Sequence, residues 1–433
     1  MLLRFGVENY RSFRDYAELS FVATKLRDAP LWRIPADGVP TGLLPVLGVY
    51  GANASGKSNL LKALDALVAH VGHSFADLKP GQAIPWTPWR LNRGEGSPLT
   101  RLDIDFLVDG VRHHYGFRFN SVRFEEEWLF RWPKGTRQVI FHRDHREAEP
   151  WSFGRELRGA KRLIADSTRP NSLFLSAAAH LNHDDLGRVA AAITEQCRPE
   201  APIELSGHPL FEQTSPLLHE GHRPTVRRLL ASADLGVRDL SARPVPEARK
   251  AILDHLRATV HPDAFDEVSK QFESEEPPVE VWLKHGADDA DSWELPPAQE
   301  SRGTHVLLAR LHDLLHVLTA GGLLMLDEID TSLHPEICAA LVGLFTGGRT
   351  NPHGAQLLFT THDRSLLSSL RRDEVVLVDK TPDGASSLRV ASDFRGVRAR
   401  DDLRRAHEQG RLGGVPVLGD FAGEFARVRE HGA

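Results

Sequence analysis

The sequence has few cysteines, no long apolar run and no large excess of one charge. Its 433 residues include two cysteines, Cys197 and Cys338, which lie far apart and belong to no C-x-x-C pair. This usage excludes a disulfide framework and favours reduced, buried thiols. No segment approaches the roughly 18 apolar residues of a transmembrane helix, and Arg4 and Glu8 stand where a signal peptide needs an apolar run. We therefore expect a cytoplasmic protein without membrane contact.

The charge balance excludes a globally basic protein. The 53 basic and 59 acidic side chains give a net charge of −6, in a chain that is 41% hydrophobic and 26% charged. This composition excludes intrinsic disorder and a histone-like nucleic-acid binder, although it permits a local basic groove. The length suggests two or three domains, or one large α/β domain with an insertion.

Two segments show the alternating pattern of an α/β fold. In the first, a nearly continuous apolar run at 43–50 precedes helical spacing at 58–69. In the second, we expect helices at 304–318, 335–344 and 364–371, and strands at 322–326, 356–360 and 375–378. One sheet to which both parts of the chain contribute explains this order best.

The remaining segments predict hairpins and an insertion. Period-two patterns predict one hairpin over 2–22 and a second over 102–119, with Asp109-Gly110 as its turn. Helical patches at 186–196, 224–235 and 247–260 are broken by proline and glycine. We predict an N-terminal part of a head domain at 1–154, an inserted, mainly helical lid at 155–290, the C-terminal part of the head at 291–390 and a tail at 391–433.

The strongest motif is a phosphate-binding loop. Gly51–Ser58 matches G-x-x-x-x-G-K-[ST] at every fixed position, between an apolar strand and an amphipathic helix. The glycines let backbone N–H groups point at a phosphate, which the helix N-terminus also favours. Lys57 would reach the β- and γ-phosphates, and the Ser58 hydroxyl would ligate Mg²⁺. The predicted ATP-binding residues are Gly51, Asn53, Ala54, Ser55, Gly56, Lys57, Ser58 and Asn59.

An acidic pair follows the second apolar strand. Leu323–Leu326 leads directly into Asp327 and Glu328, which places both carboxylates at the ligand-binding edge of an α/β sheet. Asp327 is the expected partner of Ser58 in holding Mg²⁺. Glu328 is the expected general base that orients the attacking water.

Two further pieces complete the set. Ser301, Gly303 and Thr304 open a helix and offer hydroxyl groups and bare amides to an anion. His362 follows a strand and can hydrogen-bond a phosphate or the attacking water. The spacing is 26 residues from Ser301 to Asp327 and 35 from Asp327 to His362. The order of loop, Ser-Gly helix start, acidic strand and histidine makes the pattern specific.

This order resembles ATPases of the ABC class, and within it the SMC/RecF/OLD-like branch. Leu326–Asp330 and His334-Pro335 resemble the acidic strand and D-loop of that branch. The opening F-G-V-E-N-Y-R-S-F at Phe5–Phe13 and the ending at Gly410–Pro416 resemble RloA/AbiLi-type ATPases of bacterial anti-phage defence systems. The sequence departs from the pattern of transporter-type relatives at Arg302, where those proteins carry glycine.

The resemblance implies a fold and a mechanism. The fold is an α/β, ABC-type P-loop NTPase head with a mixed sheet and flanking helices. In the implied nucleotide-sandwich dimer, Ser301 and Gly303 of one subunit cap the γ-phosphate bound by Gly51–Ser58 of another, and hydrolysis releases the heads. The implied partners are a second copy of the chain, a separately encoded effector nuclease or toxin, and nucleic acid or a phage protein as trigger. Two alternatives stay open: a RecF/SMC-like DNA-repair ATPase and an ATP-dependent assembly scaffold.

Other polar clusters are weaker candidates. About fifty residues follow Lys380, too few for the nuclease domain of OLD-type relatives, so Asp393, Asp401 and Asp402 indicate a charged surface. Neighbouring His113 and His114 face opposite sides of a strand and favour no shared metal. A last group of basic residues indicates surface and no metal: Arg223, Arg227, Arg228, His208, His219 and His222.

Overall fold

The computed structural model describes residues 1–26, 32–91, 99–198, 222–244, 279–286, 292–394, 397 and 401–413, with the single positions 217, 253, 254, 257, 265, 269 and 420. The chain forms two compact units. Unit 1 comprises Met1–Pro199, Ala320–Asp330 and Cys338–Ala433, and unit 2 comprises Glu200–Thr319 and Thr331–Ile337. Among the described helices, none is long and apolar enough to cross a membrane.

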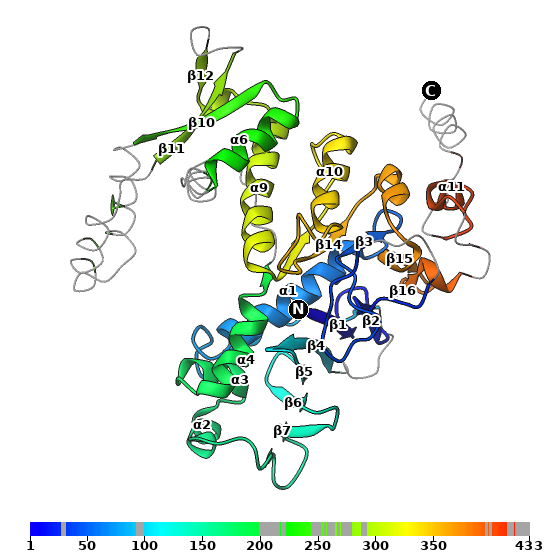
Figure 1. Cartoon of the computed structure of the whole chain (residues 1–433). Helices are drawn as coiled ribbons and strands as arrows, with labels where there is room; N and C mark the ends of the chain where they lie inside the picture. Colours follow the sequence, from blue (N-terminus) through cyan, green and yellow to red (C-terminus); the bar gives the residue numbers. More distant parts are fainter. Residues whose placement is uncertain are drawn as a thin grey trace, which may run out of the picture. The chain divides into compact units, whose positions relative to one another are not determined.

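Unit 1 contains a six-stranded sheet that both parts of the chain build, as predicted (Figure 1). Its order is β16-β15-β3-β14-β13-β9, in which β16 alone among these strands runs antiparallel to its neighbour. Every residue of the three central strands is buried, which explains their continuous apolar runs. The strands are β3 (Val46–Tyr50), β9 (Cys197–Arg198), β13 (Leu323–Leu326), β14 (Gln356–Thr360), β15 (Val375–Lys380) and β16 (Ser386–Val390).

A second sheet of unit 1 is antiparallel and has the order β2-β1-β4-β5-β6-β7-β8. Both predicted hairpins are confirmed, since β1 pairs with β2 and β4 pairs with β5. The pairing of β1 with β4 joins the two hairpins into one sheet. The strands are β1 (Leu2–Glu8), β2 (Ala17–Ser20), β4 (Thr100–Val108), β5 (Val111–Phe119), β6 (Phe124–Trp132), β7 (Gln138–Asp144) and β8 (Trp151–Phe153).

The helices after residue 155 belong to unit 1, which differs from the predicted lid boundary. α3 (Phe174–His180) and α4 (Asp184–Thr194) pack against α1 (Lys57–His73), and α2 (Lys161–Ser167) precedes them (Figure 1). Phe174, Leu186 and Ile193 are almost completely buried in the core that also contains the apolar face of α1. An amphipathic helix has the same sequence pattern whether it packs on the sheet of the head or belongs to an insertion. The pattern alone therefore does not locate the boundary between the head and the lid.

The described part of unit 2 contains a sheet as well as helices, so the expected mainly helical lid is only partly correct. β10 (Val237–Pro244), β11 (Val279–His285) and β12 (Trp293–Leu295) form an antiparallel sheet. Val226 and Leu230 of α6 (Arg223–Ser232) are buried, and α6 packs on β10. The predicted helix at 247–260 lies outside the described residues, apart from three positions.

The predicted helices of the C-terminal part are confirmed with one change of type. α9 (Arg302–Ala320) and α10 (Pro335–Phe345) cover the expected ranges. The segment Arg364–Ser369 is the 3-10 helix η3, which the Asp363 side chain caps by accepting from Ser365 N at 2.8 Å. Short helices complete the order: η2 (Pro297–Gln299), η4 (Arg372–Glu374), η5 (Ala391–Asp393) and α11 (Leu403–Glu408).

A buried carboxylate positions α3. Glu127 is fully buried and accepts from Phe174 N at 2.7 Å, Leu175 N at 3.0 Å and the Tyr115 hydroxyl at 2.9 Å. The Arg143 guanidinium lies 3.8 Å from the same carboxylate. These bonds satisfy the amides at the start of α3, which have no partner within the helix.

The Glu127→Ala variant is expected to lose about 3–5 kcal/mol of unfolding free energy, because it removes the carboxylate beside a buried guanidinium and leaves three buried donors without their acceptor. Chemical denaturation followed by circular dichroism measures this change. Glu147→Ala is the matched control: its side chain is exposed, so we expect a change within about 0.5 kcal/mol. Equal stability of the two variants would contradict the role assigned to Glu127.

Candidate nucleotide-binding site

The phosphate-binding loop lies between β3 and α1, as predicted, and two close approaches shape its backbone. A Cβ atom on Gly51 would collide with the Val378 carbonyl of the neighbouring strand β15. Gly56 has a φ of 117°, and a Cβ there would lie 2.7 Å from Ser12 Oγ and closer still to Ser386 Oγ. Both positions therefore require glycine.

Two serines outside the motif hold the loop. Ser386 Oγ on β16 donates to the Ser55 carbonyl at 2.5 Å, and Ser386 N donates to the Ser12 carbonyl at 2.7 Å. The Asn59 amide, predicted to contact nucleotide, donates to Ser12 Oγ at 2.8 Å and thus supports the loop from α1. Asn53 and Ala54 are exposed at the tip. Ser12 stands in the N-terminal motif, but no sequence signal pointed to Ser386.

Lys57 faces the loop and the acidic strand end. Its side chain is 6% exposed, and its ammonium donates to the carbonyls of Gly51 at 3.0 Å and Ala52 at 3.3 Å. Burial lowers the pKa of Lys57, while the carboxylates of Glu328 and Asp327 act in the opposite direction. A buried ammonium of this kind forms strong, charge-assisted hydrogen bonds with phosphate oxygens.

The predicted magnesium ligands lie together. Ser58 Oγ donates to Asp327 Oδ1 at 3.1 Å, across 269 residues of sequence. Thr360 Oγ1, at the end of β14, donates to the same Asp327 oxygen at 2.6 Å and accepts from Glu328 N at 2.7 Å. A hydroxyl and a carboxylate beside a phosphate-binding loop are the hard oxygen ligands that Mg²⁺ prefers. Thr360 was not predicted, because a threonine at the end of a strand carries no signal of its own.

Glu328 is exposed beside this pair, in a strained conformation. Its φ is 51°, which a non-glycine residue rarely adopts without a functional or structural reason. The next acid, Asp330, accepts from Thr361 Oγ1 at 2.7 Å and from His362 N at 3.4 Å. Asp330 thus fixes the backbone of His362, whose exposed side chain lies at the same edge of the sheet.

Ser301, Gly303 and Thr304 lie in unit 2, at the start of α9. The Ser301 hydroxyl accepts from Thr304 N at 3.1 Å and lies 2.9 Å from Thr304 Oγ1, so it caps the helix. A Cβ on Gly303 would lie 2.8 Å from the Ser332 carbonyl, in the segment after the acidic strand. Ser301 remains exposed at this helix start.

The other predicted surface residues have structural partners. Asp402 caps α11, and Asp401 pairs with Arg411 at 3.0 Å. His114 Nδ1 lies 2.8 Å from Asp105 Oδ1, whereas His113 Nδ1 lies 2.9 Å from the Val111 carbonyl, so the two histidines have different partners. Arg223 and Arg227 both pair with Asp239 on β10. His208 and His219 lie outside the described residues.

Comparison with known proteins gives one family and several structures. The sequence matches the family model described as "AAA domain, putative AbiEii toxin, Type IV TA system" over residues 46–195 and 207–368. No curated protein matches the chain.

Solved structures with a similar arrangement include three SMC heads, each 12% identical to this chain. An SMC head bound to the C-winged helix domain of ScpA has a TM-score of 0.41 and covers 90% of this chain and 96% of its own. The SMC head from Thermotoga maritima has a TM-score of 0.38, and the match covers 90% of this chain and 98% of that structure's chain. A head bound to the C-terminal domain of ScpA, derived from Pyrococcus furiosus, has a TM-score of 0.40, and the match covers 94% of this chain and 98% of that structure's chain.

Proposed function

Since the family model matches more than half of the chain, the chain belongs to this AAA-domain family, and we propose that it is a Mg²⁺-dependent ATPase of the RloA/AbiLi kind. In this proposal, ATP binding joins two heads, and hydrolysis releases them. The change between the joined and the released state of the heads controls a separately encoded effector, a nuclease or toxin, in phage defence.

The observation that carries the ATPase proposal is the convergence of Ser58, Asp327 and Thr360 beside Lys57. Magnesium, when bound, would neutralise charge on the β- and γ-phosphates. Ser58 and Asp327 would hold the ion, and Lys57 would turn from the loop carbonyls to the phosphates. Glu328 would accept a hydrogen bond from the attacking water, and His362 would lie near the γ-phosphate.

The assembly proposal depends on the exposed Ser301 at the start of α9. A helix start with a hydroxyl and free amides stabilises an anion through hydrogen bonds and the helix dipole. We infer that this surface caps the γ-phosphate bound to a second copy of the chain. Measuring the molar mass with and without ATP and Mg²⁺ tests the inference, and ATP-induced dimers that persist unchanged in Ser301→Arg would contradict it.

The defence proposal rests on the family description, which includes the words "putative AbiEii toxin, Type IV TA system", and on the N-terminal motif. The test is co-expression with the adjacent gene product, followed by phage challenge. We expect protection that requires Lys57. ATPase activity stimulated by DNA, with binding that weakens steeply with salt, would instead support the DNA-repair alternative.

The Thr360→Val variant is expected to lower the rate of ATP hydrolysis about 10- to 100-fold and to raise the magnesium concentration needed. Valine keeps the shape of the side chain but removes the hydroxyl that orients Asp327 and the Glu328 backbone. A magnesium titration of the ATPase rate measures both effects. Thr360→Ser keeps the hydroxyl and serves as the control, and a wild-type rate in Thr360→Val would refute this role.

A further inference from the structure

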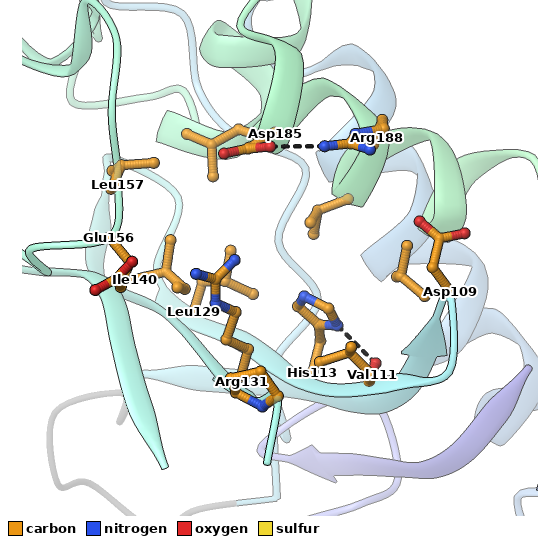
Figure 2. A pocket seen from close by; sticks show the side chains of 14 residues that line it. Asp109, Val111, His113, Leu129, Arg131, Ile140, Glu156, Leu157, Asp185 and Arg188 are labelled. Carbon is orange, nitrogen blue, oxygen red and sulfur yellow. Dashed lines mark hydrogen bonds and ion pairs between the residues drawn. The ribbon is translucent and has the colours of Figure 1, made fainter. Parts of the chain in front are cut away.

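A cavity of about 160 Å³ lies in unit 1 between the antiparallel sheet and α4, and no step of the proposed ATPase uses it (Figure 2). Its apolar lining comes from Leu129 and Ile140 on the sheet, Leu157 in the following loop, and Leu186 and Val189 on α4. All five side chains are at least 94% buried. A closed apolar cavity of about 150 Å³ accepts benzene, so this one has room for a single six-membered ring.

Two polar side chains reach into the cavity from neighbouring strands. His113 on β5 and Arg131 on β6 are direct cross-strand partners, and Figure 2 shows them side by side in the cavity. Side chains that face each other in this way have Cβ atoms about 5 Å apart. A single small ligand can therefore contact both groups at once.

His113 presents a hydrogen-bond acceptor. Its Nδ1 lies 2.9 Å from the Val111 carbonyl, which can only accept, so Nδ1 carries the proton. Burial and the nearby Arg131 lower the pKa of His113, which favours the neutral ring. Nε2 then carries a lone pair. The side chain is 7% exposed, and Nε2 points into the cavity (Figure 2).

Arg131 presents donors beside this acceptor. Its Nε donates to Gln138 at 3.1 Å, which orients the guanidinium and leaves the terminal nitrogens directed into the cavity (Figure 2). A carboxylate would satisfy Arg131 but would place its second oxygen against the lone pair of His113. An ammonium group would suit His113 but would be repelled by Arg131.

We propose that this cavity binds the cyclic-amide edge of a single six-membered ring, as found in uracil and thymine. Arg131 donates to the ring carbonyl oxygen, and His113 Nε2 accepts from the adjacent ring N–H. Leucine and valine side chains from the sheet and α4 cover the two faces of the ring.

The acidic side chains at the rim of the cavity favour an uncharged ligand that carries this ring. Asp109 and Glu156 lie at the rim, and Asp185 pairs with Arg188 at 2.7 Å. Because Arg188 offsets the charge of Asp185, Asp109 and Glu156 leave the rim with an excess of negative charge, which disfavours a phosphate attached to the ring. The proposed ligand is therefore a pyrimidine nucleoside, and neither a nucleotide nor a base within a nucleic-acid chain.

Calorimetric titration of the full chain with uridine tests the proposal. We expect binding at millimolar concentration or below. N3-methyluridine lacks the N–H, and cytidine has an acceptor in its place, so both should bind at least about tenfold more weakly. Guanosine, with two fused rings, should also bind more weakly. Equal binding of uridine and N3-methyluridine, or no binding of uridine, overturns the proposal.

Variants and charged ligands provide the second test. Arg131→Met and His113→Phe should each weaken uridine binding at least about tenfold. Arg137→Gln, outside the cavity on the β6–β7 turn, should leave it unchanged. Uridine monophosphate and oligouridine should bind no more tightly than uridine. Tighter binding of either would overturn the assignment to a nucleoside.

Discussion

Replacing Lys57 by alanine is expected to lower ATP hydrolysis at least about a hundredfold and to weaken ATP binding. The ammonium is the one cation that the described residues place inside the phosphate-binding loop, where it donates to the carbonyls of Gly51 and Ala52. Its charge has no replacement among the backbone amides, which supply only partial charges. Steady-state hydrolysis and fluorescent-nucleotide titration measure the two effects.

Lys62→Ala is the matched control for this prediction. Lys62 lies five residues further along α1 and is exposed, so its removal should change neither quantity. Full protection against phage by Lys57→Ala, with unchanged release of the effector, would contradict the proposed switch even if hydrolysis were lost.

Replacing Glu328 by glutamine is expected to lower hydrolysis about 10²- to 10⁴-fold while leaving ATP binding intact. Glutamine keeps the size of the side chain but cannot act as the base toward water. Because Thr360 holds the Glu328 backbone, the substitution should leave the loop geometry unchanged. Single-turnover hydrolysis and nucleotide affinity separate the two effects.

Glu336→Gln provides the control, since this exposed residue lies in the first turn of α10. A wild-type rate in Glu328→Gln would show that another group serves as the base. If the effector were controlled normally while hydrolysis was lost, the chain would be an assembly scaffold that uses ATP without turning it over.

The central strands and the order of the motifs could be predicted because both depend on local patterns. Buried parallel strands read as continuous apolar runs, and their carboxyl ends meet at one edge of the sheet. This geometry brings Ser58 and Asp327 together although 269 residues separate them. The predicted strand at 356–360 agrees with β14 at both ends.

The supporting residues could not be predicted, because their roles depend on contacts between distant segments. Ser386 supports a carbonyl 331 residues away, and Glu127 accepts from the start of α3. The pairing of β1 with β4 likewise joins strands from separate hairpins. Serine, threonine and glutamate are common surface residues, so only the fold reveals which of them are buried and paired.

The most direct test of the proposed switch is the molar mass of the Glu328→Gln variant, measured by light scattering with and without ATP and Mg²⁺. The proposed mechanism predicts a monomer without nucleotide and a stable dimer with ATP, and a monomer under both conditions for Lys57→Ala. A Glu328→Gln chain whose mass does not change with ATP would contradict the ATP-dependent joining of two heads.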